Sequence, residues 1–155
     1  MPSLLNKTIN HFQTSPPCEA YAAPFDVRLL DKTKSMKANK DVLTVVQPDL
    51  CVICDLEKLD DKGCIGSPDL IVEILSVSNS KKEMRTKKSL YEENGVKEYW
   101  IVDPVHETLF QYVLQTDETY APPLIFVHDE IVQSAIFSQL ELNLLDIFET
   151  QTEED

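Results

Sequence analysis

SPDLIVEILSVSNSKKEMRTKKSLYEENGVKEYWIVDP, residues 67–104, contains the pattern from which the fold can be inferred. Apolar runs at 69–77 and 97–103 flank a stretch, 81–94, whose apolar residues recur with helical spacing. Ser80 with a glutamate three residues later is a capping box at a helix N-terminus, and Asn94-Gly95 is a C-terminal stop. The stretch therefore predicts a strand–helix–strand unit at the centre of an α/β domain.

Further elements are expected on both sides of this unit. Helices are predicted at 3–14 and 144–149, and extended or strand segments at 18–30, 42–55, 107–114 and 124–129. The polar residues 31–41 are predicted to form a mobile loop. The expected fold is a mixed β-sheet flanked by helices in a single domain, residues 1–155, with an acidic tail at 150–155.

Composition places the chain among soluble globular proteins. It has 155 residues, of which 43% are hydrophobic and 26% charged. No apolar segment approaches the roughly 18–20 residues of a membrane span, and the first residues lack the apolar core of a secretory signal. We therefore expect a cytoplasmic protein without a membrane partner.

The net charge of −13 is distributed unevenly. Residues 1–97 hold 14 Lys and Arg against 14 Asp and Glu, whereas residues 98–155 hold 13 Asp and Glu and no Lys or Arg. Within residues 81–88 five bases face one acid. Such a cluster is more often a solvated helix face than a phosphate site. The acidity belongs to the last third, so it does not exclude a nucleic-acid partner for the rest.

The four cysteines invite a zinc interpretation because Cys51 and Cys54 have C-x-x-C spacing. Both lie in an expected strand, where side chains three residues apart point to opposite faces, so they cannot converge on one ion or form a disulfide with each other. We expect all four, including Cys18 and Cys64, to be reduced structural thiols.

Glu73 is the residue that an apolar strand does not explain. A buried carboxylate is costly without a cation, a metal or several hydrogen-bond donors. At 100° per residue, Lys87 falls within the apolar arc of the following helix and is aimed at the sheet. Two interpretations compete: a structural ion pair or a snorkelling lysine, and a site in which carboxylates hold a divalent cation beside the lysine.

Asp49 is the best partner for Glu73. If the strands that contain them are antiparallel neighbours, Asp49 lies near the end of the second strand, close to Glu73. Asp69 is four residues from Glu73, roughly 13 Å along a strand, which is too far to share one ion. We interpret Asp69 as a residue that caps backbone N–H groups.

A family resemblance rests on VVQPDLCVICD, PDLIVEILS and YEENGVKEYWIVDP. The chain closely resembles the Uma-type putative restriction endonuclease family, long labelled a domain of unknown function, within the PD-(D/E)XK nuclease superfamily. The match runs from about Tyr21 to Phe148. It implies a restriction-endonuclease-like fold and metal-dependent hydrolysis of phosphodiester bonds in DNA.

The resemblance also implies a catalytic set, Asp49, Glu73 and Lys87. The superfamily lysine usually follows two positions after the acidic residue, but position 75 is Leu, so Lys87 on the helix is expected to replace it. Asp49, Glu73 and the carbonyl of Ile74 are expected to bind Mg²⁺ or Mn²⁺. The residues expected to contact DNA phosphates are Lys81, Lys82, Arg85 and Lys88. Tyr91, Tyr99 and Trp100 are assigned to core packing.

Two departures from the family pattern leave an alternative open. Glu83 stands where the family usually has Asp, and the chain begins near the first helix, so an N-terminal segment of the family is expected to be missing. The alternative is therefore a catalytically inactive member that acts as a scaffold or binding protein. The missing segment would leave Leu4, Leu5 and Phe12 with fewer partners, which predicts a homodimer through the N-terminal half.

Overall fold

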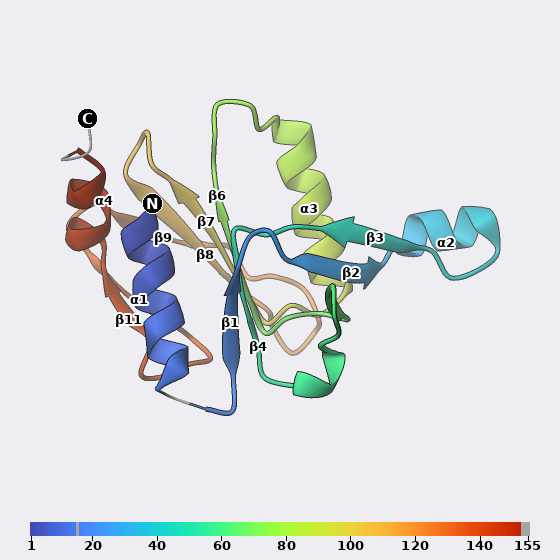
Figure 1. The fold of residues 1–155 in the computed structure, drawn as a ribbon. Coiled ribbons are helices and arrows are strands. Elements are labelled where there is room, and N and C mark those ends of the chain that lie inside the picture. Colours follow the sequence, from blue (N-terminus) through green and yellow to red (C-terminus); the bar gives the residue numbers. More distant parts are fainter. Residues whose placement is uncertain (15, 153–155) are drawn as a thin grey trace.

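A six-stranded mixed sheet forms the centre of the computed structural model, which describes residues 1–14 and 16–152 (Figure 1). Its strand order is β1-β4-β6-β7-β8-β9. β6 and β7 run parallel, and the other neighbouring pairs run antiparallel. The strands are Glu19–Ala22 (β1), Leu50–Ile53 (β4), Leu70–Ile74 (β6), Glu98–Asp103 (β7), Thr108–Val113 (β8) and Leu124–Val127 (β9). The predicted fold class is confirmed.

The predicted strand–helix–strand unit consists of β6, the helix α3 (Lys81–Glu93) and β7. Ser80 caps the helix because its side chain accepts a hydrogen bond from the backbone N–H of Glu83 at 3.0 Å. Gly95 follows the helix with φ of +71°, a left-handed conformation that favours glycine. Parallel strands require a long crossover, and α3 provides it.

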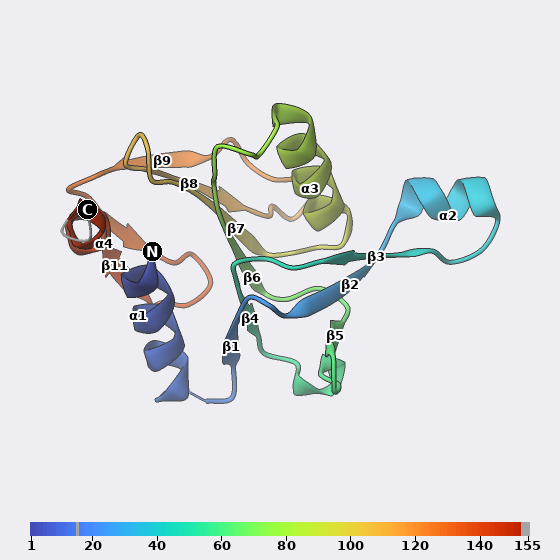
Figure 2. The ribbon, with the colours of Figure 1, turned by 45° about the horizontal axis from the view of Figure 1, so that its top comes forward.

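A second sheet of three strands and a short helix form an arm that projects from the main sheet (Figures 1 and 2). The elements are β2 (Asp26–Leu30), α2 (Lys32–Ala38), β3 (Leu43–Val46) and β5 (Gly63–Ile65), with β2 between β3 and β5. We call residues 26–46 the arm, and the three-stranded sheet β3-β2-β5 the arm sheet. A 3-10 turn, Leu56–Lys58, precedes β5.

The prediction of a mobile loop at 31–41 is wrong, because α2 occupies most of this segment. The Asp31 side chain caps the helix by accepting the backbone N–H of Lys34 at 3.0 Å, and Asn39 ends it in the left-handed conformation. α2 buries none of its residues. It therefore has no apolar stripe from which periodicity could have predicted it.

Apolar residues cover both faces of the main sheet in two clusters. One lies between the sheet and the N- and C-terminal elements, and includes Leu4, Val72 and Trp100. The other lies between the sheet, α3 and the arm, and includes Ile71 and Tyr91. Because side chains alternate along a strand, Glu73 faces the same side as Ile71 and therefore points toward α3.

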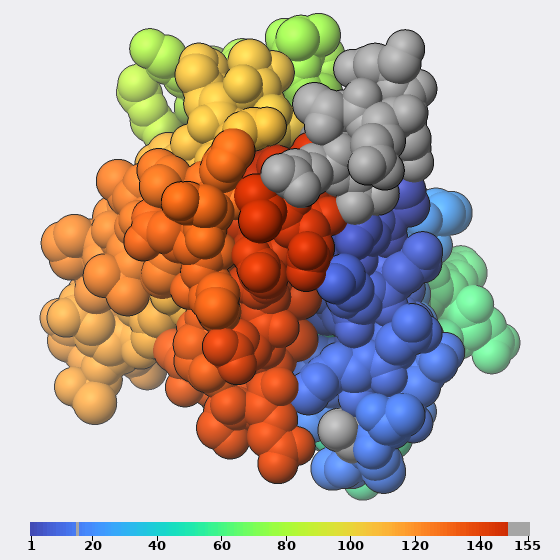
Figure 3. Space-filling view, turned by 90° about the vertical axis from the view of Figure 1, so that its left-hand side faces the viewer, coloured from blue at the N-terminus to red at the C-terminus, as the bar shows by residue number. Residues whose placement is uncertain are grey.

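The two ends of the chain lie side by side on the face opposite α3 (Figure 3). The elements are α1 (Pro2–Gln13), α4 (Leu144–Thr152), β10 (Ile131–Gln133) and β11 (Glu141–Asn143). Leu4 and Phe12 are buried in the core and Leu5 packs against it, so the expectation that these three residues have fewer partners and leave an apolar surface is wrong. Of the expected acidic tail, residues 150–152 continue α4 and residues 153–155 lie outside the described residues.

The structure also corrects the prediction that all four cysteines are free thiols. Cys18 and Cys54 form a disulfide with a Cα–Cα distance of 4.0 Å, while Cys51 and Cys64 are free and buried. Glu19 pairs with Ile53 across β1 and β4, so the same register places Cys18 opposite Cys54. Strand alternation correctly separates Cys51 from Cys54, but it gave no information about this cross-strand partner. Within the described ranges, no helix is long and apolar enough to cross a membrane.

Candidate active site

Asp49, Glu73 and Lys87 come together at the end of β6 that faces α3. Leu50 pairs with Val72 in the antiparallel β4–β6 ladder, and the same register places Asp49 opposite Glu73. Asp49 Oδ2 accepts the backbone N–H of Ile74 at 2.6 Å. Lys87 Nζ lies 3.8 Å from Glu73 Oε2.

Strand pairing and helix phase together account for this arrangement. Residues directly opposite each other in an antiparallel pair project to the same face, so Asp49 and Glu73 both project toward α3. The Lys87 side chain is only 24% exposed, as expected for a residue within the apolar arc of the helix. Asp69 lies elsewhere: it accepts the N–H of Cys54 at 2.8 Å and pairs with Lys97, the backbone-capping position expected for it.

Glu73 is a buried carboxylate whose charge is only partly compensated. The residue is 6% exposed, and its Oε1 accepts a hydrogen bond from the Tyr91 hydroxyl at 2.6 Å. Burial raises the pKa of Glu73, the Tyr91 hydrogen bond and Lys87 oppose this rise, and the carboxylates of Asp49 and Glu83 add to it. A further cation at this position would favour the ionised form.

Glu98 shows that this fold can satisfy a buried carboxylate without any cation. It is fully buried on β7, on the opposite side of the sheet from α3. Its two carboxylate oxygens accept hydrogen bonds from Trp100 Nε1, Gln111 Nε2, Ser134 Oγ and the N–H groups of Ala135 and Ile136. Glu73 has one such neutral donor and a lysine. The contrast marks Glu73 as the carboxylate whose charge a bound cation would compensate.

The donor atoms at this position fit a hard divalent cation. Asp49 and Glu73 each use one carboxylate oxygen in a hydrogen bond, to Ile74 N–H and Tyr91 respectively. Carboxylate oxygens are the ligands that Mg²⁺ prefers, and Mg²⁺ usually keeps several waters when only one or two carboxylates hold it. Residues 1–14 and 16–152 contain no cluster of three or more His, Cys, Asp or Glu suited to a metal. An ion here would therefore rely on two side chains and backbone oxygen.

The expected phosphate contacts do not form one uniform group. Lys81, Lys82 and Arg85 are exposed on α3, and Lys81 and Arg85 line a small pocket beside the end of β6. Lys88 is half-buried, with its Nζ 4.9 Å from the centre of the Tyr112 ring, a cation–π contact. The first three remain available to a ligand, whereas Lys88 is held on the protein.

Two tyrosines belong to the site in addition to the core. Tyr91 and Tyr99 are fully buried, as expected, with ring centroids 5.0 Å apart. Tyr91 donates to Glu73, whereas the Tyr99 hydroxyl has no hydrogen-bond partner within the described part of the chain. Burial raises the pKa of both phenols. The helical spacing of Tyr91 and Lys87 indicates the shared face, but not the hydrogen bond.

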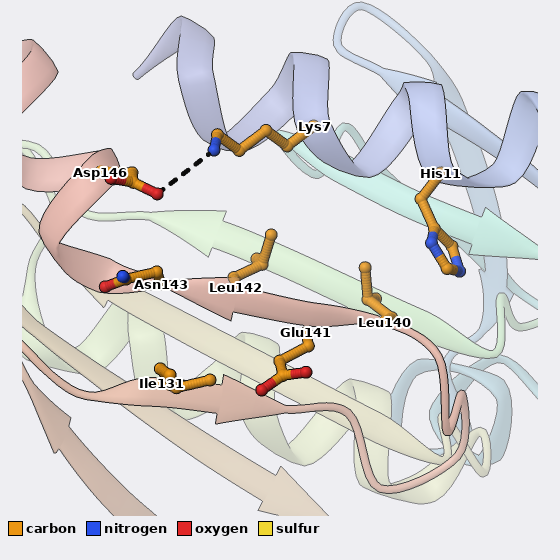
Figure 4. A pocket seen from close by; sticks show the side chains of 8 residues that line it. All are labelled: Lys7, His11, Ile131, Leu140, Glu141, Leu142, Asn143 and Asp146. Atoms are coloured by element: carbon orange, nitrogen blue, oxygen red, sulfur yellow. Dashed lines mark ion pairs between the residues drawn. The ribbon is translucent and has the colours of Figure 1, made fainter.

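A separate pocket of about 400 Å³ lies between α1, β11 and α4 (Figure 4). Lys7 and Asp146 form an ion pair across it at 3.5 Å, and His11, Glu141 and Asn143 contribute to its wall. These elements cover the face of the sheet opposite α3. The pocket includes none of the sequence-predicted site residues.

Known proteins that resemble this chain share its fold or its family. No curated protein matched the chain. A solved structure described as a putative nuclease belonging to DUF820, from Anabaena variabilis ATCC 29413, is similar in fold with a TM-score of 0.71 and 18% sequence identity. The similarity covers 96% of this chain and 77% of that one. The family described as Uma2, putative restriction endonuclease, matches residues 2–145, and the chain belongs to this family.

Proposed function

We propose that the protein is a metal-dependent endonuclease that hydrolyses phosphodiester bonds in DNA through Asp49, Glu73 and Lys87. One observation supports this most. The buried Glu73 carboxylate, whose negative charge is only partly compensated, lies opposite Asp49, and its Oε2 is 3.8 Å from Lys87 Nζ. Family membership and a nuclease-like fold support a nuclease role for that arrangement. The set corresponds to a PD-(D/E)XK site whose lysine comes from α3.

Each residue has a distinct proposed role. Asp49 and Glu73, with the carbonyl of Ile74, would hold Mg²⁺ or Mn²⁺. When bound, such an ion polarises the phosphate and lowers the pKa of a water. Lys87 orients the attacking water or neutralises charge that develops on the phosphate. Tyr91 keeps the Glu73 carboxylate in one orientation through its 2.6 Å hydrogen bond.

Positive residues on α3 would bind the flanking phosphates. Lys81, Lys82 and Arg85 are exposed beside the site and would contribute a salt-sensitive, sequence-independent attraction to DNA. Lys88 would contribute less, because its ammonium group already lies over Tyr112.

Cleavage of supercoiled and linear DNA in Mg²⁺ or Mn²⁺ tests the proposal. Glu73→Gln and Lys87→Met should each reduce the rate by about 100-fold or more, the range expected for loss of a group that stabilises the transition state. Glu57→Gln and Lys62→Met change the same residue types far from the site and should retain the wild-type rate. Cleavage that persists unchanged in Glu73→Gln would remove Glu73 from the mechanism.

The acidic last third supports one rival function, a non-catalytic scaffold or binding protein. Residues 98–155 carry 13 acids and no Lys or Arg, so this third offers no basic surface to DNA. A purified protein that binds a partner but cleaves neither DNA nor RNA with either metal would favour that rival.

We also propose a homodimer through the N-terminal half. The apolar surface for this contact is the outer face of the arm sheet and not α1. The residues exposed on that face are Leu30, Leu43, Val45 and Ile65.

A further inference from the structure

The arm contains a well-defined helix that contributes nothing to the hydrophobic core. α2 buries none of its residues. Its ends are nevertheless held: Asp31 accepts from Thr44 Oγ1 at 2.9 Å as well as from Lys34 N–H, and Ser35 Oγ accepts the N–H of Val42 at 2.8 Å. An ordered helix that buries no side chain presents a surface, and here that surface is basic.

A cleft of about 510 Å³ separates this helix from α3. Lys34 and Lys37 line it from α2, where residues three apart share one face, and Arg85 lines it from α3. Hydroxyl groups complete both walls, from Thr33, Thr44, Thr86 and Ser89. Thr44 and Thr86 already donate to Asp31 and to the Lys82 carbonyl, so the cleft presents three cations and the hydroxyls of Thr33 and Ser89 to a ligand.

These cations are only partly compensated within the protein. Among the described residues, none of Lys34, Lys37 and Arg85 forms a salt bridge. Two carboxylates also line the cleft, Asp31 and Glu93. Asp31 is committed to the cap, and the backbone N–H of Lys34 is the main reason that its pKa is lowered. Asp31 therefore stays ionised, and both carboxylates oppose an anionic ligand, but the three cations that line the cleft outnumber them.

The arm and α3, which form the walls of the cleft, are also next to the candidate active site. β3 of the arm ends at Val46, three residues before Asp49. On the other side, Leu90 lines the cleft and lies about 60° from Lys87 around α3, so the surface of α3 that faces the cleft adjoins the one that carries Lys87. Arg85 lies at the far edge of the cleft surface, about 160° from Lys87. Figures 1 and 2 show β2 and β3 extending from the main sheet toward α2, with α3 beside them. A polymer lying between Asp49 and Lys87 would continue between the arm and α3.

We propose that this cleft binds the phosphodiester backbone of duplex DNA beside the scissile bond. Lys34 and Lys37 of the arm and Arg85 of α3 contact consecutive phosphates, and the hydroxyls of Thr33 and Ser89 donate to phosphate oxygens. The choice of DNA rests on the proposed function, whereas the assignment of the arm as a polyanion-binding clamp rests on the cleft itself.

Salt-dependent binding of a fluorescent DNA duplex tests the clamp without requiring catalysis. Measurements use the full chain carrying Glu73→Gln, without divalent metal. Removal of one lysine–phosphate interaction reduces the slope of log K against log[salt] by about one. Lys34→Gln with Lys37→Gln should therefore weaken binding to all sequences alike and reduce the slope by about two. Lys32→Gln with Lys40→Gln changes the charge of the same segment equally, outside the cleft, and should leave the slope unchanged.

The other possible outcomes each overturn one part of the proposal. Equal effects of the two double variants, no effect of the first pair, or no duplex binding by the parent protein overturns the clamp. An RNA duplex bound as tightly, with the same dependence on Lys34 and Lys37, overturns the assignment to DNA. If the wild type cleaves DNA but the two double variants have the same salt slope, the proposed catalytic function is supported and the clamp is overturned. If the slopes differ but the wild type does not cleave DNA, the clamp is supported and the proposed catalytic function is overturned.

Discussion

At the scale of single residues, the buried hydroxyls of Tyr91 and Tyr99 differ in whether they form a hydrogen bond. Tyr91 donates to the Glu73 carboxylate, whereas Tyr99 is buried without a partner in the described chain. Tyr91→Phe should lower the free energy of unfolding by about 1–3 kcal/mol, because it leaves a buried carboxylate with one donor fewer. Tyr99→Phe removes an unpaired hydroxyl and should be neutral or stabilising. Urea unfolding of the metal-free variants measures both, and equal losses would contradict the difference.

Glu73 makes the stability of the metal-free protein depend on pH. Its pKa is raised chiefly by burial, so the folded state binds the proton more tightly than the unfolded chain, and ionisation penalises folding. The penalty is absent below the unfolded pKa of about 4.3 and grows as the pH rises toward the folded pKa. Glu73→Gln should therefore stabilise the metal-free protein by about 0.5–2 kcal/mol at neutral pH, and the two proteins should converge near pH 4.

Glu98→Gln is the matched control for this pH dependence. Every group of the described chain that contacts the Glu98 carboxylate is a hydrogen-bond donor. The N–H₂ group of a glutamine side chain placed there would therefore face other donors and find no acceptor. The substitution should lower the free energy of unfolding by about 1–3 kcal/mol. Urea unfolding over a pH series separates the two glutamates, and a loss of stability at neutral pH in Glu73→Gln would contradict a raised pKa for Glu73.

These residues also show how far the sequence reaches. Glu73 and Lys87 were identifiable because each is charged where its strand or helix pattern requires an apolar residue. Glu98 lies at the start of an apolar strand, where a charged residue is unremarkable, and its donors come from residues up to 38 positions away. Pairings of that separation depend on the tertiary fold, so local patterns do not reveal them.

At the scale of elements, the long periodic segments were predictable and the short ones were not. α3 has an apolar stripe, a cap and a glycine stop, each visible in the sequence. α2 rests on its caps alone, and β5, β10 and β11 have three residues each, too few to show alternation. Tertiary pairing determines such elements, so the segment of the arm that contains α2 was predicted as a loop and its cleft with α3 was missed.

The Cys18–Cys54 disulfide joins the segment before β1 to the end of β4. It closes a loop with a sequence separation of 36, for which the chain-entropy model gives a stabilisation of roughly 4 kcal/mol. Cys18→Ser should lower the free energy of unfolding by about 2–4 kcal/mol under oxidising conditions and have little effect in excess reductant. Cys64→Ser changes a free buried thiol and should respond equally in both conditions. A Cys18→Ser effect that reductant does not diminish would contradict the disulfide.

At the scale of the whole molecule, the two faces of the arm sheet have different characters. The inner face carries Val27, Leu29 and Cys64 into the core. On the outer face, Leu30 pairs with Leu43, and Arg28 lies between Val45 and Ile65. Arg28 is bound to Asp60 at 2.5 Å, so its charge is compensated and the outer face is predominantly apolar.

This outer face predicts where two copies associate. Leu30, Leu43, Val45 and Ile65 are between 37% and 54% exposed, and an exposed apolar surface of this kind favours a protein–protein contact. Residues 98–155 carry 13 acids and no Lys or Arg, so like charges oppose contact through the last third. A symmetric pair joined at the outer face would leave the inner cleft of each arm open and supply two active sites, one for each strand of a duplex.

Light scattering at micromolar concentration in moderate salt should show a dimer, and Val45→Lys should shift it to monomer. Leu124→Lys, an equally exposed apolar position on the edge strand β9, should leave the dimer intact. A monomeric wild type, or dissociation by Leu124→Lys alone, would rule out an interface at the arm.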